Sequence, residues 1–118
     1  MKNMPGRRRY RQGKCGSDEH SNPCSRLFKV LASDQRLEIL KLLQEGEKSS
    51  AEITEQLHLD ASVISRHLRM MRNFRMIAVR KERNVLFFSI ADKRVLEMWS
   101  IAREIITDLY TWNLGKID

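Results

Sequence analysis

Hydrophobic residues recur every three or four positions along much of this chain, which is the spacing of amphipathic helices. We expect a first helix to start near Cys24 and a second to follow Ser33-Asp34, a cap-like interruption. Gly46 is placed to end that second helix. The apolar positions of these two helices are Leu27, Phe28, Leu31, Leu37, Ile39, Leu40, Leu42 and Leu43.

Two more short helices are predicted next, joined by a tight turn. Ser49 and Glu52 have the spacing of a capping box at the start of the first one. His58-Leu59 form the turn, and Asp60 caps a second helix over residues 61–73. The buried stripe of that helix is Ile64, Leu68 and Met71. Its other faces carry Ser62, Ser65, Arg66, Arg69 and Asn73.

After this helix the hydrophobic period changes from 3.6 residues to 2, which predicts strands. Residues 76–81 and 85–90 form a β-hairpin, in which Asn84 suits a left-handed turn position. Asp92 then caps a long helix that runs to about Trp112. The expected fold is mainly α with a small β-hairpin. The methionines Met70, Met71 and Met76 are expected to fill the core.

The last predicted helix carries a wide apolar stripe. It consists of Val95, Met98, Trp99, Ala102, Ile105, Ile106, Leu109 and Trp112. A chain of 118 residues cannot easily bury such a stripe alone. We therefore expect a homodimer whose interface contains Leu27, Phe28, Leu31, Met98, Trp99, Ala102, Ile105, Ile106, Leu109 and Trp112.

The net charge of +7 is concentrated in two zones. Residues 1–14 carry six basic residues and no acid, and residues 61–83 carry seven basic residues and one acid. Two positive zones on an otherwise acidic chain suit a polyanion. We expect residues 1–23 to be a flexible basic arm, residues 24–113 a single folded domain, and residues 114–118 a short tail.

The helix over residues 61–73 is the candidate DNA-reading element, because its exposed face combines hydroxyls with guanidinium groups. In a helix-turn-helix the first residues of the second helix reach base edges. The candidates for base contacts are Ala61, Ser62, Ser65 and Arg66. The candidates for phosphate or minor-groove contacts are Arg69, Arg72, Arg80, Lys81 and Arg83. His67 is expected to pack or to bond a phosphate.

Three segments of the chain are similar to the ArsR/SmtB family of dimeric bacterial and archaeal repressors. Leu27–Leu43 resembles the opening of that family, Ser62–Leu68 its recognition-helix signature, and Val79–Lys81 the start of its wing. The resemblance covers roughly residues 25–112 and implies a dimeric winged helix-turn-helix.

The chain departs from this family at several positions. Family members often carry glycine where this chain has His58 and Arg75, and a Gly-Arg wing tip where it has Arg83-Asn84. Metal sensors of the family often have a Cys-x-Cys pair on the helix before the turn, or Asp and His ligands on the last helix. Residues 50–57 contain no cysteine, and residues 92–112 contain no histidine.

Cys15, His20 and Cys24 are the candidates for sensing. They supply three ligands of the kind that zinc or a thiophilic metal takes, and the two thiols could also form a reversible disulfide. Absence of any sensing role is the third alternative. No cofactor is certain.

The sequence predicts a sequence-specific transcriptional regulator, a homodimeric repressor that binds a near-palindromic operator in double-stranded DNA. No apolar run reaches the length of a membrane span, so we expect no membrane contact and a cytoplasmic location. No phosphate-binding loop, nucleophile elbow or pair of catalytic carboxylates occurs, so we expect no enzyme. The alternatives are a winged-helix protein-interaction module and an architectural DNA binder with little sequence preference.

Overall fold

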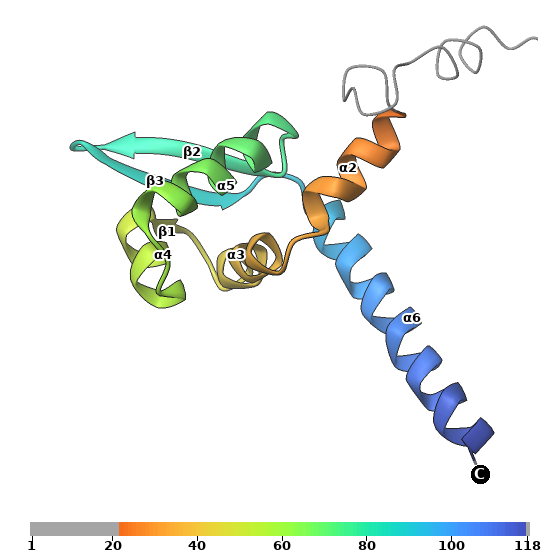
Figure 1. The fold of residues 1–118 in the computed structure, drawn as a ribbon. Coiled ribbons are helices and arrows are strands. Elements are labelled where there is room, and N and C mark those ends of the chain that lie inside the picture. The colour runs from red at the N-terminus through yellow and green to blue at the C-terminus, as the bar shows by residue number, and fades with distance from the viewer. Residues whose placement is uncertain (1–21, 118) are drawn as a thin grey trace, which may run out of the picture. The chain divides into compact units, whose positions relative to one another are not determined.

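The computed structural model describes residues 22–117, with their side chains as far as Asn113. The chain divides into two compact units between Leu37 and Glu38, which are described in turn. Its elements are α2 (Pro23–Leu31), α3 (Asp34–Gln44), β1 (Lys48–Ser49), α4 (Ser50–Leu57), α5 (Ala61–Asn73), β2 (Ile77–Glu82), β3 (Val85–Ile90) and α6 (Arg94–Ile117) (Figure 1). Helices with one small antiparallel sheet confirm the predicted fold class.

In the first unit, Ser33 and Arg36 fix the junction between α2 and α3. The Ser33 hydroxyl accepts a hydrogen bond from the backbone N–H of Arg36 at 3.3 Å, which confirms the predicted cap. The Arg36 guanidinium donates to the carbonyl oxygens of Val30, at 2.6 Å, and Lys29, at 3.4 Å. These carbonyls belong to the last turn of α2, where a helix lacks internal partners for them.

In the second unit, α4 and α5 form the predicted helix-turn-helix. The Ser49 hydroxyl accepts a bond from the N–H of Glu52 at 3.1 Å, and the Glu52 carboxylate accepts one from the N–H of Ser49 at 2.7 Å. This confirms the capping box. His58 ends α4 in the left-handed conformation, with φ of 55°. Asp60 occupies the N-cap position of α5 as predicted, but its side chain makes no capping hydrogen bond.

The C-terminus of α5 closes in a Schellman motif. The N–H of Met76 donates to the carbonyl oxygen of Met71 at 3.0 Å, and the N–H of Arg75 donates to that of Arg72 at 2.8 Å. Arg75 has φ of 59°, the left-handed conformation that this motif requires. Met71 and Met76 are both buried, which supplies the apolar contact that accompanies the motif.

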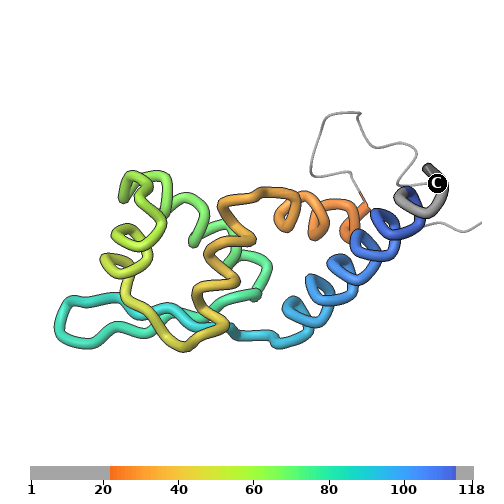
Figure 2. The backbone as a smooth tube through the Cα atoms, turned by 90° about the horizontal axis from the view of Figure 1, so that it is seen from below, coloured from red at the N-terminus to blue at the C-terminus, as the bar shows by residue number. Residues whose placement is uncertain are grey.

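The sheet is antiparallel, in the order β1-β3-β2. The predicted hairpin is confirmed, with Val79 opposite Phe88. Its turn contains only Arg83 and Asn84, with φ of 53° and 69°, as in a type I′ turn. The turn lies at the free end of the hairpin, beyond α4 and α5 (Figure 2). The third strand, β1, pairs with β3 and was not predicted.

The core is formed by aliphatic side chains from several elements. The fully buried ones with the largest volumes are Ile39, Leu40, Ile53, Ile64 and Met71. Met71 and Met76 fill the core as predicted, but Met70 does not, because it is 37% exposed. Met70 precedes Met71 on α5, and a rotation of about 100° per residue turns it out of the buried stripe.

The last helix, α6, begins beside Asp92 and is five residues longer than predicted. The Asp92 carboxylate accepts bonds from the guanidinium of Arg94, the closest at 2.7 Å, and from its backbone N–H at 3.0 Å. The bonds from the Arg94 side chain and then from its backbone lower the pKa of Asp92 to about 2. Asp92 therefore stays ionised at neutral pH. None of the described helices is both long and apolar enough to cross a membrane.

Candidate nucleic-acid interface

The face of α5 opposite the core carries the side chains proposed to contact DNA. Ile64, Leu68 and Met71 are 1%, 3% and 0% exposed, which confirms the predicted buried stripe. The exposed positions of α5 are Ala61, Ser62, Ser65, Arg66, Arg69, Met70, Arg72 and Asn73. The helix thus presents hydroxyl and guanidinium groups together on its outer side.

Three arginines on this face hold uncompensated charge. Among the described residues, none of Arg66, Arg69 and Arg72 is paired with a carboxylate. A guanidinium without an acidic partner can take a phosphate oxygen or the O6 and N7 atoms of guanine. The face is therefore suited to an anion.

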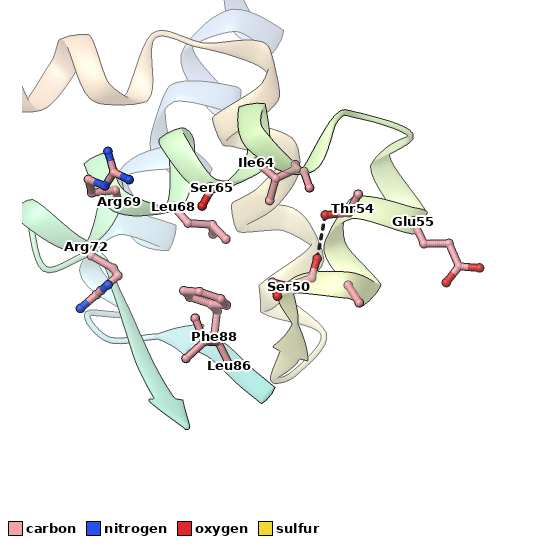
Figure 3. A pocket seen from close by; sticks show the side chains of 12 residues that line it. Ser50, Thr54, Glu55, Ile64, Ser65, Leu68, Arg69, Arg72, Leu86 and Phe88 are labelled. Atoms are coloured by element: carbon pink, nitrogen blue, oxygen red, sulfur yellow. Dashed lines mark hydrogen bonds between the residues drawn. The ribbon is translucent and has the colours of Figure 1, made fainter. Parts of the chain in front are cut away.

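The exposed face has two parts, which follow from the helical repeat. Ser62, Arg66 and Asn73 lie on the side of α5 directly opposite Ile64. Ser65 and Arg72 are rotated toward α4 and β3, where they line a cleft together with residues of those elements (Figure 3). Arg69 lies between the two parts and also borders the cleft.

His67 differs from the other candidate DNA contacts, because it is only 7% exposed. It lies beside Leu68 on the edge of the buried stripe. Of the two expectations for this residue, packing agrees with so small an exposed surface. The burial favours the packing alternative, and a contact of His67 with DNA stays a prediction.

Arg80 is held by partners within the protein. Its guanidinium donates to the Glu47 carboxylate at 2.7 and 2.9 Å and to the Glu82 carboxylate at 2.7 Å. Its Cζ atom lies 4.6 Å from the centre of the Phe87 ring. The bond to Glu47, then that to Glu82, raises the pKa of Arg80. These bonds use three of the five N–H groups of the Arg80 guanidinium, and a contact of Arg80 with phosphate stays a prediction.

Glu47 was missed by the sequence reasoning. It lies between α3 and β1, and the hydrogen bonds from Arg80 lower the pKa of its carboxyl group. The two residues are 33 positions apart, so no local spacing connects them. We call Arg80, Glu47 and Glu82 the hairpin clasp, because they join the loop before β1 to the hairpin.

The remaining basic candidates lie on the hairpin. Lys81 and Arg83 are exposed, and Arg83 occupies the turn. Among the described residues neither forms an ion pair. Their charges therefore remain available to an anion beside α5.

The candidate sensing residues are only partly described by the structure. Cys15 and His20 lie outside the described residues. Cys24 is a free, exposed thiol in the first turn of α2, and its backbone N–H donates to the Asn22 side chain at 2.8 Å. The described residues contain no group of three or more side chains that could hold a metal ion. A role of these residues in sensing stays a prediction.

Most of the predicted dimer contacts are accessible. On α6, Ile105, Ile106, Leu109 and Trp112 are 46–60% exposed, and Ala102 is also exposed. Met98 and Trp99 are half-buried, as are Leu27 and Leu31, whereas Phe28 is 59% exposed. Ile101 and Tyr110, which were not among the predicted contacts, are likewise 55% and 65% exposed on α6. Ile101 precedes Ile105 by four residues, so helical spacing alone could have identified it.

Comparison with known proteins agrees with this geometry. Residues 33–79 match the family model described as "Bacterial regulatory protein, arsR family". The "Probable mercury resistance operon repressor" of Streptomyces lividans is 29% identical over 75% of this chain and 71% of its own. The uncharacterised HTH-type transcriptional regulator Rv0081 of Mycobacterium tuberculosis is 32% identical over 67% of this chain and 70% of its own.

Solved structures show the same architecture. The crystal structure of Rv0081 from M. tuberculosis has a TM-score of 0.71, at 29% identity, over 80% of this chain and 99% of that one. HlyU from Vibrio cholerae has a TM-score of 0.63, at 29% identity, over 70% and 89%. The HlyU sequence from V. cholerae, named a transcriptional activator, is 33% identical to this chain over 61% of this chain and 67% of the HlyU chain. The protein therefore belongs to the arsR family of bacterial regulatory proteins and is a winged helix-turn-helix transcriptional regulator that binds DNA.

Proposed function

We propose that the protein is a homodimeric repressor that binds a near-palindromic operator in double-stranded DNA. Each subunit would place α5 in the major groove of one half-site, with the β2–β3 hairpin beside it, and the half-sites would lie about one helical turn apart. The observation that carries this proposal is the exposed face of α5, on which Arg66, Arg69 and Arg72 have no carboxylate partner among the described residues. The mercury resistance repressor provides a relative named for repression.

Within this proposal the N-terminal half of α5 has a different role from the basic residues that follow it. Ala61, Ser62, Ser65 and Arg66 lie in the N-terminal half of the helix, which reads bases in a helix-turn-helix. Arg69, Arg72, Lys81 and Arg83 would hold phosphates or the minor groove and would orient the protein without reading sequence. This scheme does not depend on the predicted contacts of Arg80 and His67.

The proposed site of action is the cytoplasm, where the chromosomal DNA of a bacterium or archaeon lies. The proposed activity is binding alone, without catalysis. It rests on the charged helix face, since a recognition helix needs complementary charge and shape but no reactive group.

The test is a DNA selection followed by a substitution. Binding sites would first be selected from random double-stranded DNA, and affinities measured at fixed salt. We expect selection of an inverted repeat. Arg66→Ala should then weaken binding by about 1–3 kcal/mol and relax the preference at one base pair of each half-site. Lys41→Ala, which removes an exposed charge from α3, is the matched control and should keep the preference.

The outcomes separate the alternatives. Selection without any consensus would replace this proposal with an architectural DNA binder. Absence of DNA binding, together with a stable complex with another protein, would indicate an interaction module. A uniform loss of affinity in the Arg66 variant across all sequences would make Arg66 a phosphate contact.

A further inference from the structure

A cleft lies between α4, α5 and β3, and the DNA-contact scheme accounts for only one side of it. Its volume is about 600 Å³, and twelve residues line it. This volume lies within the range of about 300–1,000 Å³ that is typical of sites for small molecules. All of its lining residues lie between positions 50 and 88, within the second compact unit.

The interior of the cleft is apolar. Ile64 and Leu68 contribute from α5, and Leu86 and Phe88 from β3. Figure 3 shows that Leu68 and Phe88 approach each other across it. Leu86 remains 41% exposed even though it is a large aliphatic residue on the same strand face as the buried Phe88. Exposed aliphatic surface of this kind favours an apolar occupant.

The border of the cleft is positive at one end. Arg69 and Arg72 stand there on α5 (Figure 3). The single acidic residue of the lining, Glu55, points away at the opposite end. Among hydroxyls in the lining, that of Thr54 is already used, since it donates to the carbonyl oxygen of Ser50 at 2.8 Å. An occupant therefore meets apolar surface inside and two guanidinium groups at the rim.

We infer that this cleft binds a small organic anion with a flat or branched apolar body and one carboxylate, and that such a ligand competes with DNA. The apolar body would lie against Leu86, which is 41% exposed, and the carboxylate would accept bonds from Arg72 or Arg69. Leu68 and Phe88, which are 3% and 4% exposed, would form the floor of the site. A guanidinium binds a carboxylate through two parallel bonds, which suits this end of the cleft. The charge of the border excludes a cation, and the apolar interior disfavours a bare inorganic anion.

The ligand and DNA would compete because both would bind Arg69 and Arg72. This step rests on the proposed function. Arg69 and Arg72 are proposed phosphate contacts, so a carboxylate bound to them removes two of the charges that hold DNA. Binding of the ligand to the free protein and binding of DNA then weaken each other by the same factor. The cleft would thereby supply a release signal on the DNA-reading helix itself.

The test uses 2-naphthoate as the probe, which has one carboxylate on a two-ring apolar body. Binding to the full-length protein is measured by calorimetric titration, without DNA. We expect 2-naphthoate to bind saturably. 2-Naphthalenemethanol, which has the same rings and no charge, should bind at least about tenfold more weakly. Arg72→Gln and Leu86→Gln should each weaken 2-naphthoate binding by about tenfold. Both side chains are exposed, so neither change removes a core residue.

Arg66→Gln is the matched control, because it removes an equal charge from the part of α5 outside the cleft. It should keep the affinity for 2-naphthoate within about twofold while it weakens DNA binding. Saturation with the selected DNA should weaken 2-naphthoate binding by about tenfold. If the protein bound 2-naphthoate but no DNA, the proposed function would be refuted, whereas the proposed ligand site would be supported.

Three results would overturn the inference. One is the absence of 2-naphthoate binding at millimolar concentration. Another is equal weakening in the Arg66→Gln and Arg72→Gln variants, which would indicate nonspecific attraction to the charge of α5. The last is a loss of DNA affinity in both cleft variants without any 2-naphthoate binding, which would show that a strand of DNA occupies the cleft.

Discussion

His58, Arg75, Arg83 and Asn84 all have positive φ, between 53° and 69°. Only glycine adopts this conformation without steric cost, and other residues lose about 1–2 kcal/mol there. Three of these sites coincide with positions where similar family members often carry glycine. At these three sites the chain therefore adopts a left-handed backbone conformation with residues whose Cβ atoms make that conformation sterically unfavourable.

Arg75 gives the clearest test of this cost. It is exposed and occupies the left-handed position of the Schellman motif at the end of α5. Arg75→Gly should raise the free energy of unfolding by about 0.5–1 kcal/mol, since relief of the strain exceeds the added entropy of the unfolded chain. Arg75→Ala keeps the Cβ atom and should give no such gain. Chemical denaturation at one fixed protein concentration measures both, and equal effects would contradict the argument.

Among the elements, the β2–β3 hairpin is tied to a distant loop by an ion pair. The hairpin clasp joins it to the loop before β1 through Arg80 and Glu47, which are 51% and 34% exposed. The bonds to Glu47 and Glu82 use three of the five N–H groups of Arg80, which leaves fewer for an anion outside the protein. If the hairpin lies beside DNA as proposed, the clasp limits how many phosphates it can hold.

Glu47→Ala should free two N–H groups of Arg80 for a phosphate of DNA, while the bond to Glu82 remains. The slope of log affinity against log salt concentration should become steeper by about one, because one more phosphate is neutralised. Glu45→Ala is the matched control: it removes a neighbouring carboxylate whose only ion pair among the described residues is that with Lys48 at 3.8 Å. The slope is measured with the selected DNA between low and physiological salt. Equal slopes in the two variants would show that Arg80 stays on the hairpin.

The elements that could be predicted from the sequence are those defined by local patterns. The capping box at Ser49 and the buried stripe of α5 depend on residues within a few positions, and both were found. The strand β1 has two residues, too few for any period, and exists because it pairs with β3. The Arg80–Glu47 contact likewise spans 33 positions. Sequence patterns therefore did not predict these contacts between residues that lie far apart in the chain.

Local sequence patterns also predicted only part of the candidate DNA-binding site. The exposed face of α5 was predicted because its period is regular. For His67 the sequence left packing and a phosphate bond open, because its position in the helical repeat lies at the edge of the buried stripe, and its 7% exposure favours packing. The cleft beside α5 was not predicted, because Leu86 and Phe88 come from a strand that folds back beside the helix.

At the scale of the whole molecule, we propose that the homodimer forms through the apolar face of α6. Ile101, Ile105 and Trp112 recur at helical spacing and are 55–60% exposed. Polar residues occupy the other side, among them Ser100, Arg103 and Thr107. A helix that is apolar on one exposed side is stabilised when that side is removed from water. A second copy of α6 would remove it and would also set the spacing of the two α5 helices.

Ile105→Glu should therefore convert a dimer into a monomer, because it places a charge in the middle of the apolar face. Sedimentation should show half the mass, and affinity for the two-half-site DNA should fall by about 10²-fold or more, since the second half-site is no longer bound within one complex. Binding to a single half-site should be unchanged. Thr107→Glu adds the same charge on the polar side and should remain dimeric. A dimeric Ile105 variant, or a monomeric Thr107 variant, would place the interface elsewhere.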